Sequence, residues 1–354
     1  MFRLEPRAEA SVFMAWFSPL LAVLLTVVCG ALLFVAVDKD PLTSLAVFFV
    51  EPLKDLNGWA EVGVKVAPLL TIAVGLALCF RAKVFNIGAE GQLIVGAIAA
   101  GAFILAVDTD THGGPLLITA AIMAGALGGM LWAALVAWLR DQFNANEILV
   151  SLMLVYVAEL LLSYLVHGAL RDPDGFGFPQ SRLFSDGFLL PSVLQGTRLH
   201  LGIVLACLAA VLGWLYLSRS FSGFKLQVGG MAPLAARYAG FSSRRALWAS
   251  LLVSGGLAGI AGAAEIMGPI GQLTPSVSPG YGFAAIIVAF VGRLHPIGVI
   301  FSSFIMALLY IGGELSQSRL GMPSAITGIF QGILLFSLLA CDVLIHNKLR
   351  WGKK

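Results

Sequence analysis

The sequence contains few charged residues and few cysteines. Only 12% of its 354 residues are Asp, Glu, Lys or Arg, and 59% are hydrophobic, whereas soluble domains carry roughly 25% charged residues. So little charge excludes an ordinary soluble fold, because only helices that face lipid need this much apolar surface. The cysteines stand singly in apolar stretches without a CxxC pair, which favours small packing residues over a metal site or a disulfide. They are Cys29, Cys79, Cys207 and Cys341.

The sequence also lacks the common motifs of catalysis. It has no GxxxxGK[ST] phosphate loop, no HExxH zinc motif and no GxSxG nucleophile elbow. Its five histidines are dispersed along the chain. We therefore expect a chain that is not an enzyme and that binds no metal, cofactor or ATP itself.

Apolar runs dominate what is present. Eight runs approach or exceed the length of about 20 residues that a membrane helix needs. A ninth and a tenth, 281–292 and 296–312, are shorter and are split by Arg293-Leu294-His295-Pro296, which predicts a broken helix pair. The fold class is therefore an all-α integral membrane protein with about ten transmembrane helices. The eight long runs cover 13–37, 62–80, 84–107, 115–139, 145–166, 199–217, 246–268 and 323–342.

The basic residues indicate the topology. With a cytoplasmic N-terminus and ten alternating spans, fifteen of the 22 Lys and Arg residues fall on the inside, as the positive-inside rule requires. Both termini are then cytoplasmic. Residues 167–198 form an outside loop, and residues 218–245 form an inside loop with five basic residues and no acid. The run Leu42–Val50 is too short to span and is placed at the outer interface.

The whole chain, 1–354, is interpreted as a single transmembrane domain in the inner (plasma) membrane of a bacterium. The first apolar run exceeds the h-region of a signal peptide and is interpreted as an uncleaved span. The same triplet occurs twice: the second span leads into Gly91-Gln92-Leu93, and the seventh span leads into Gly271-Gln272-Leu273. These two spans cross the membrane in opposite directions. This faint match is the basis for interpreting spans 2–5 and 7–10 as an inverted repeat.

The stretch from Phe85 to Gln92 carries the polar residues of greatest interest. It sets Asn86, Glu90 and Gln92 among glycines beside the second and third spans. Ionisable groups at membrane depth are costly and commonly face a cavity or a partner. The stretch is therefore a candidate lining or gate of a pathway. The alternative is a short cytoplasmic turn in which Lys83 or Arg81 neutralises Glu90.

Further polar residues lie in later spans. Asn146 and Glu147 suit the N-terminus of a helix, where they cap amides and meet the helix dipole. Glu159 lies deeper in the same run, and Glu265 lies near the end of the seventh span. Glycines precede Glu265 at helical spacing and indicate tight helix packing. They are Gly255, Gly256, Gly259 and Gly262.

The inside loop contains a short helix framed by proline and glycine. Such a short helix needs a surface on which to dock. It is interpreted as a coupling helix that contacts a cytoplasmic partner, and the alternative is a basic loop lying on anionic lipid headgroups. The residues assigned to coupling are Ala232, Pro233, Ala236, Arg237, Tyr238 and Gly240.

At these residues the chain resembles a known family, the permeases of bacterial ABC importers in the branched-chain amino acid and ribose permease superfamily. Within it, the nucleoside branch is the closest match. The resemblance covers about residues 60–342 and rests on six segments. They are 85–92, 146–156, Arg171-Asp172-Pro173, Pro179-Gln180-Ser181, 235–240, and Gly280-Tyr281-Gly282-Phe283 leading to Gly292-Arg293.

The resemblance implies partners that the residues alone do not reveal. They are a cytoplasmic ABC ATPase that hydrolyses ATP, a second homologous permease that completes a heterodimer, and an extracytoplasmic binding protein or lipoprotein at loop 167–198. Membrane lipid and a small-molecule substrate complete the set, and no nucleic acid is expected. By the same analogy the residues near the translocation path are Phe85, Asn86, Glu90, Gln92, Tyr281 and Phe283.

The resemblance implies uptake of nucleosides, with purine nucleosides favoured. Aromatic faces and amides suit a base and a ribose, although they suit other polar rings as well. Ribose or another simple sugar is the alternative within the same class. An ion-coupled secondary transporter is the alternative from another class, with Glu90, Glu159 and Glu265 as its ion sites. The basic loop 218–245 favours the ABC permease, because a secondary transporter needs no docking helix.

Overall fold

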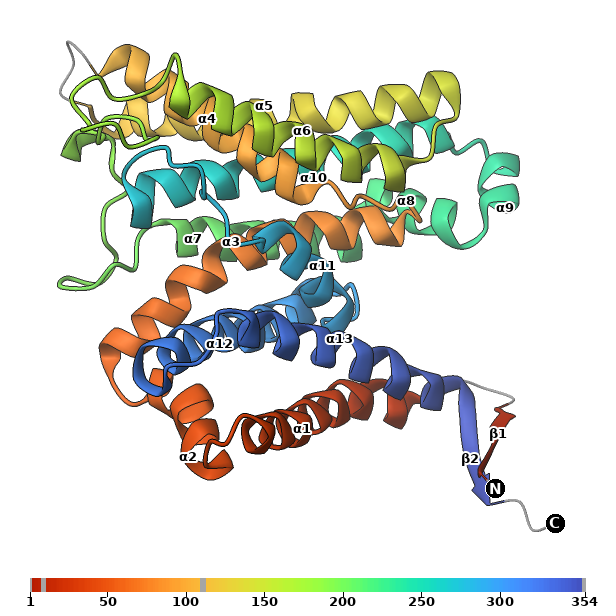
Figure 1. Ribbon diagram of the computed structural model, residues 1–354. Helices are drawn as coiled ribbons and strands as arrows, with labels where there is room; N and C mark the ends of the chain where they lie inside the picture. Colours follow the sequence, from red (N-terminus) through yellow and green to blue (C-terminus); the bar gives the residue numbers. More distant parts are fainter. Residues whose placement is uncertain (1, 8–10, 109–112, 352–354) are drawn as a thin grey trace. The chain divides into compact units, whose positions relative to one another are not determined.

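The computed structural model describes residues 2–7, 11–108 and 113–351, which are mostly helical (Figure 1). They divide into two compact units, one holding Met1–Trp59 and Ile305–Lys354 and the other holding Ala60–Phe304. Nine helices of the described residues are long and apolar enough to cross a membrane. The prediction of an all-α membrane fold is confirmed, while the single domain over 1–354 stays a prediction.

The long helices follow the predicted apolar runs. Three boundaries differ by five residues or more: the second span begins at Leu56 rather than at 62, the third begins at Ala89 rather than at 84, and the helix after Pro296 continues to Leu320 rather than ending at 312. The helix continues because the polar residues beyond 312 include no proline to interrupt it. The nine helices are α1 (Val12–Ala36), α3 (Leu56–Arg81), α4 (Ala89–Val107), α5 (Pro115–Phe143), α6 (Glu147–His167), α7 (Gly202–Arg219), α10 (Ser243–Glu265), α12 (Pro296–Leu320) and α13 (Ala325–His346).

The predicted broken pair is present. Its first member is the short helix α11 (Tyr281–Val291), which at roughly 16 Å is too short to cross a bilayer. Arg293 and Leu294 then adopt left-handed backbone conformations, with φ of 58° and 53°, and α12 begins at Pro296. Of the two predicted short runs, 281–292 is therefore half a span and 296–312 belongs to a complete one.

The smaller unit is built on the pairing of α1 with α13. Phe34, Phe48 and Phe330 are fully buried within it, and the rings of Phe48 and Phe330 stack with centroids 4.4 Å apart. The run before α3 forms only short helical pieces, as expected for a segment that cannot span. These pieces are α2 (Pro41–Leu45), the π-helix η1 (Ala46–Val50) and the 3₁₀-helix η2 (Glu51–Leu53).

Two short strands, which the sequence analysis did not anticipate, join the ends of the chain. Strand β1 (Phe2–Pro6) pairs antiparallel with β2 (Asn347–Trp351), with Phe2 opposite Trp351 and Pro6 opposite Asn347. Because the two ends meet in one ribbon, they lie on the same side of the membrane, as predicted. Their cytoplasmic location stays a prediction.

In the larger unit, α4, α5 and α10 pack with their backbones in contact. A Cβ atom placed on Gly259 would lie 2.1 Å from the carbonyl oxygen of Gly125, and one on Gly262 would lie 2.1 Å from the carbonyl oxygen of Leu93. No side chain fits there. The prediction that the glycines of this span mark tight helix packing is confirmed, and this packing is typical of membrane interiors.

The inside loop contains more helix than predicted. Helix α8 (Phe221–Met231) begins where the Ser220 hydroxyl accepts a hydrogen bond from the Gly223 amide at 2.9 Å. Helix α9 (Pro233–Tyr238) is the predicted short helix, and Gly240 ends it with a φ of +76°. Two short helical elements complete this unit. The π-helix η4 (Ile266–Ile270) extends α10, and the 3₁₀-helix η3 (Asp186–Phe188) lies in the outside loop.

The two Gly-Gln-Leu triplets occupy different local structures. Gly91-Gln92-Leu93 lies in the first turns of α4, whereas Gly271, with a φ of +75°, begins an irregular segment after η4. The triplets therefore do not share a conformation. The inverted repeat stays a prediction.

Candidate functional site

The start of α4 is held by a pair of buried amides. Asn86 Nδ2 donates to Gln92 Oε1 at 2.9 Å, and Gln92 Nε2 donates back to Asn86 Oδ1 at 3.1 Å. Asn86 Nδ2 also donates to the Ser254 hydroxyl on α10 at 3.0 Å, and the Gly88 amide donates to Asn86 Oδ1 at 3.1 Å. Asn86 and Gln92 are fully buried. These bonds hold residues 84–88 out of the helix and explain why α4 begins late.

Glu90 caps the N-terminus of α11. Its Oε2 accepts a hydrogen bond from the Gly282 amide at 2.6 Å, and the Ser278 side chain and the Gly280 backbone also hydrogen-bond to its carboxyl group. The Ser278 hydroxyl in turn accepts from the amide of Tyr281 at 3.0 Å. A carboxylate is stabilised at a helix N-terminus by the exposed amides and the helix dipole.

Close backbone contact fixes this cap. A Cβ on Gly282 would lie 2.2 Å from the Glu90 amide nitrogen, so any other residue would separate α11 from α4. Glu90 is 3% exposed. The cytoplasmic-turn alternative placed Glu90 beside Lys83 or Arg81, but the structure buries it against α11. Lys83 is exposed in the turn after α3.

Lys65 is a functional candidate that the sequence analysis missed. It lies nine residues after the start of α3, roughly 14 Å along the helix and close to the middle of a 30 Å hydrocarbon layer. Its Nζ lies 5.8 Å from the centroid of the fully buried ring of Tyr281. The signal was present, because a lysine inside an apolar run is by itself a functional candidate.

The other predicted pathway residues do not all gather here. Tyr281, the first residue of α11, lies beside the Glu90 cap. Phe85 is half-buried, and its ring lies 5.9 Å from that of Phe80, which stacks on Phe290 at 5.1 Å. Phe283 is 39% exposed on α11. The structure thus brings the polar candidates together around the starts of α4 and α11 and leaves the two phenylalanines at separate contacts.

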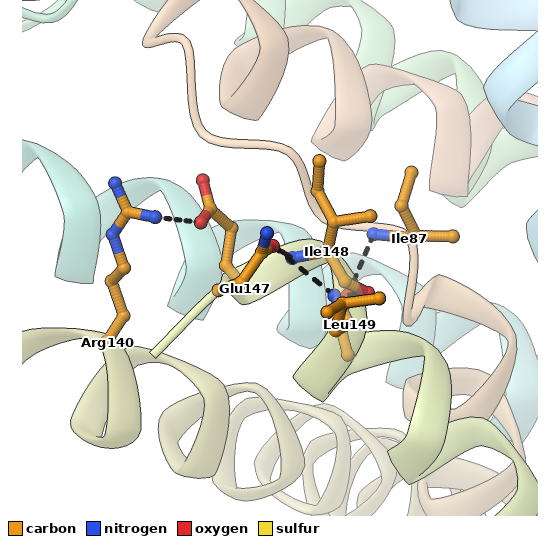
Figure 2. Close-up of polar contacts among 7 residues, drawn as sticks. Ile87, Arg140, Glu147, Ile148 and Leu149 are labelled. Atoms are coloured by element: carbon orange, nitrogen blue, oxygen red, sulfur yellow. Dashed lines mark hydrogen bonds and ion pairs between the residues drawn. The ribbon is translucent and has the colours of Figure 1, made fainter. Parts of the chain in front are cut away.

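The first turns of α6 lie against Ile87, in the segment that precedes α4 (Figure 2). Asn146 Oδ1 accepts from the Ile148 amide at 2.9 Å, which confirms the predicted helix cap, and Glu147 pairs with Arg140. The Ser151 hydroxyl accepts from the Ile87 amide at 3.2 Å. Asn146 and Glu147 therefore stabilise the start of α6.

The remaining acids of the predicted site differ in exposure. Glu159 lies on the exposed face of α6, about 18 Å along the helix from Glu147. Glu265 is 6% exposed at the end of α10, and η4 continues the helical span beyond it. Glu265 therefore lies near the end of the helical span Ser243–Ile270, as expected.

The predicted coupling residues form an exposed helix. Ala232 precedes α9, and Ala236 is the one buried residue of the helix, at 4% exposed, whereas Leu234 and Tyr238 are 84% and 98% exposed. An apolar and an aromatic side chain with this exposure are unusual in water and typical of a contact surface. Arg237 is also exposed.

Arg81, at the end of α3, links the inside loop to the broken helix pair. Its Nη1 donates to Gln227 Oε1 on α8 at 2.9 Å, and its Nε donates to the Leu294 carbonyl oxygen at 2.8 Å. Burial and the charge of Arg81 lower the pKa of His295 in the same turn, so His295 is neutral at pH 7. The sequence does not reveal this link, because the bonded residues are far apart in the chain and no local pattern pairs them.

These features define the class. A set of membrane-crossing helices that contains a half-helix, with a carboxylate at its buried N-terminus and an intramembrane lysine, is typical of a membrane transport protein. The chain belongs to the family of permease components of branched-chain amino acid transport systems, whose family model matches residues 59–339. The multi-pass membrane location and the resemblance over about 60–342 are confirmed, and members of this family are transport components.

The relatives of the chain are ABC permeases with different named substrates. The glucose ABC transporter permease protein TsgB13 of Haloferax volcanii is 35% identical over 96% of this chain and 91% of that protein. The guanosine ABC transporter permease protein NupP of Bacillus subtilis is 31% identical over 90% of this chain and 91% of that protein. The guanosine ABC transporter permease protein NupQ of the same organism is 27% identical over 70% and 80%.

Proposed function

We propose that the chain is the permease subunit of an ABC importer for nucleosides, energised by ATP hydrolysis on a separate cytoplasmic subunit. The family supports the ABC permease over the ion-coupled alternative. The similarity to NupP over nine-tenths of the chain supports a nucleoside substrate. A nucleoside presents hydroxyl and carbonyl oxygens, and Lys65 supplies a donor for them beside Tyr281.

The position proposed for the substrate path rests on the exposed carboxylate of Glu159 on α6. A charged side chain facing lipid in the middle of a span is costly, and such residues face a water-filled path or a protein partner. The exposed face of α6 therefore meets a second permease, with the substrate path between the two chains. Two different guanosine permease proteins of one organism, NupP and NupQ, support a heterodimer.

Coupling to the ATPase uses α9. Leu234 and Tyr238 present the exposed surface that a cytoplasmic subunit contacts. Movement of this loop reaches α11 through the Arg81 hydrogen bonds to Gln227 and to the Leu294 carbonyl oxygen. An extracytoplasmic binding protein delivers substrate at loop 167–198.

A simple sugar is the second candidate substrate, because TsgB13 is a glucose permease protein and is 35% identical to this chain. A hexose presents hydroxyl groups to the same donors but lacks a base. The two candidates therefore differ in the ring that a nucleoside would bring to the path.

Copurification followed by uptake tests the proposal. The tagged chain is purified from its native membranes in mild detergent, its partners are identified by mass spectrometry, and the complex is reconstituted with ATP inside the vesicles. We expect an ATPase and a second permease, and uptake of radiolabelled guanosine that unlabelled inosine suppresses and unlabelled glucose does not. The reverse pattern of competition would assign a sugar. A chain recovered alone that transports without ATP would contradict the ABC assignment.

The same assay tests Lys65. Lys65→Met should raise the KM for the transported substrate roughly ten- to 150-fold, because a charge-assisted hydrogen bond contributes roughly 1.5–3 kcal/mol. Lys83→Met is the matched control, since Lys83 is exposed outside the spans, and it should leave KM unchanged. Equal KM values in the two variants would remove Lys65 from the path.

A further inference from the structure

A hollow of about 480 Å³ lies in the larger unit between the end of α7, the helices α8 and α9, and the start of α10. We refer to it as the cationic pocket, because its lining includes three basic side chains and three serine hydroxyls and no acidic residue. These residues are Lys225, Arg237, Arg245, Ser222, Ser242 and Ser243.

The three cations differ from Arg244, which lies in the same loop and has an acidic partner. Arg244, adjacent in sequence to Arg245, forms an ion pair with Asp141 at 2.7 Å. Within the part of the chain that the structure describes, Lys225, Arg237 and Arg245 form no ion pair. The Lys225 ammonium lies over the ring of Phe221, 4.4 Å from its centroid. Three convergent positive charges without a counterion attract an anion.

Side chains beside the pocket mark the level of the membrane surface. Near the end of α7, Arg219 lies 5.8 Å from the centroid of the Trp214 ring, and tryptophan gathers at the headgroup level of membranes. Phe221 and Phe224, at the start of α8, are 64% and 53% exposed, with stacked rings 6.3 Å apart. An apolar surface therefore adjoins a cationic pocket where a membrane helix ends.

We propose that the cationic pocket binds the phosphodiester headgroup of an anionic phospholipid, with the acyl chains lying along Phe221 and Phe224. The arginines and serine hydroxyls supply donors for the phosphate oxygens. A free phosphate would use the cations but not the exposed rings, which favours the lipid. Leu234 and Arg237 of α9 line the pocket and Tyr238 does not, so the lipid would occupy one side of α9 while Tyr238 stays available to a protein partner.

Lipid titration of the purified full-length chain tests this site. Native mass spectrometry measures binding of dioleoyl phosphatidylglycerol, dioleoyl phosphatidylcholine or inorganic phosphate alone. The pocket variant is Lys225→Gln with Arg245→Gln, and the matched control is Arg219→Gln with Arg244→Gln. The control removes two charges from the same loop, and neither of its residues lines the pocket. No transport is measured, so the result is independent of the proposed substrate and of coupling.

We expect phosphatidylglycerol to bind about tenfold more tightly than phosphatidylcholine, as expected for two basic contacts near a membrane surface. The pocket variant should lose this preference and the control should keep it. Equal losses in both variants would indicate general surface charge and overturn the site. Binding of inorganic phosphate that blocks the lipid would assign a soluble anion instead. Loss of bound lipid when the ATPase associates would assign the pocket to the protein interface.

Discussion

The buried polar residues around α4 and the cationic pocket around α8–α10 are two regions of the same unit with opposite electrostatics. Around α4, Asn86, Glu90 and Gln92 are each hydrogen-bonded to other parts of the chain. In the cationic pocket, Lys225 and Arg245 form no ion pair among the described residues. In these two regions, buried polar side chains are hydrogen-bonded within the chain, whereas charges without an ion pair lie where a ligand or solvent can reach them.

The physical reason is desolvation. A buried polar group without a partner costs roughly 1–3 kcal/mol, and more if it is charged. An exposed cation keeps its water and costs almost nothing, and exposed ion pairs contribute only about 0–1 kcal/mol. Polar residues at the start of α4 therefore stabilise the half-helix, while those of the inside loop remain available for partners. Three predictions test this contrast, in order of expected effect on stability.

The largest effect is expected from Glu90. Glu90→Ala removes the acceptor of the Gly282 amide and should lower the free energy of unfolding by about 1–3 kcal/mol, while the protein still inserts in the membrane. Transport should be impaired because α11 loses its cap. Thermal unfolding in detergent and uptake in vesicles measure the two effects.

Glu90→Gln is the matched control, because the amide keeps an acceptor oxygen at the same place. It should recover most of the stability. If it also recovers transport, the hydrogen bond is what matters; if it does not, the charge is required in transport. An alanine variant that unfolds and transports as the wild type does would refute the capping role.

A smaller net effect is expected from removing both amides of the reciprocal pair. Asn86→Leu alone leaves Gln92 unpaired in the interior and should cost about 1–3 kcal/mol. Asn86→Leu with Gln92→Met should cost less than the sum of the single changes, with a coupling energy of roughly 1 kcal/mol. Unfolding of all four proteins in one detergent completes the cycle. Strictly additive losses would show that the pair does not act as a unit.

The smallest effect on stability is expected at α9. Arg237→Glu with Tyr238→Glu alters two exposed side chains and should change the free energy of unfolding by less than about 0.5 kcal/mol. Uptake should nevertheless be lost while the ATPase still hydrolyses ATP, because the docking surface is reversed in charge. Parallel assays of uptake and phosphate release measure this, with Lys83→Glu as the control on the same side. Undiminished uptake in the double variant would exclude the coupling role.

Much of the fold followed from the sequence because lipid imposes length and composition on every span. The break at Arg293–Pro296 and the glycine packing of α10 were both predicted, since proline and small residues act locally. The late start of α4 was not predicted, because it depends on Asn86 reaching Gln92 and Ser254. Strands β1 and β2 were missed for a similar reason, as they pair opposite ends of the chain.

The candidate site shows the same division. The sequence singled out Glu90 but offered only a pathway or a cytoplasmic turn, and the structure added the cap on α11. Lys65 was overlooked although a lysine in an apolar run is visible in any sequence. Glu159 was placed deeper in its span than Glu147, and the structure adds that it lies on an exposed face. The assignment of these residues to a substrate path stays a prediction.

By itself the sequence determined that the protein lies in a membrane, where most of its helices begin and end to within a few residues, and which permease family it resembles. Those properties depend on hydropathy, helix breakers and local motifs, which act over short stretches of chain. Only the tertiary structure decided that Glu90 caps a helix almost two hundred residues away, that Arg81 joins α8 to the broken pair, and that Lys225, Arg237 and Arg245 line one hollow. Each of these depends on which helix faces are brought together, and that follows from the packing of the whole chain.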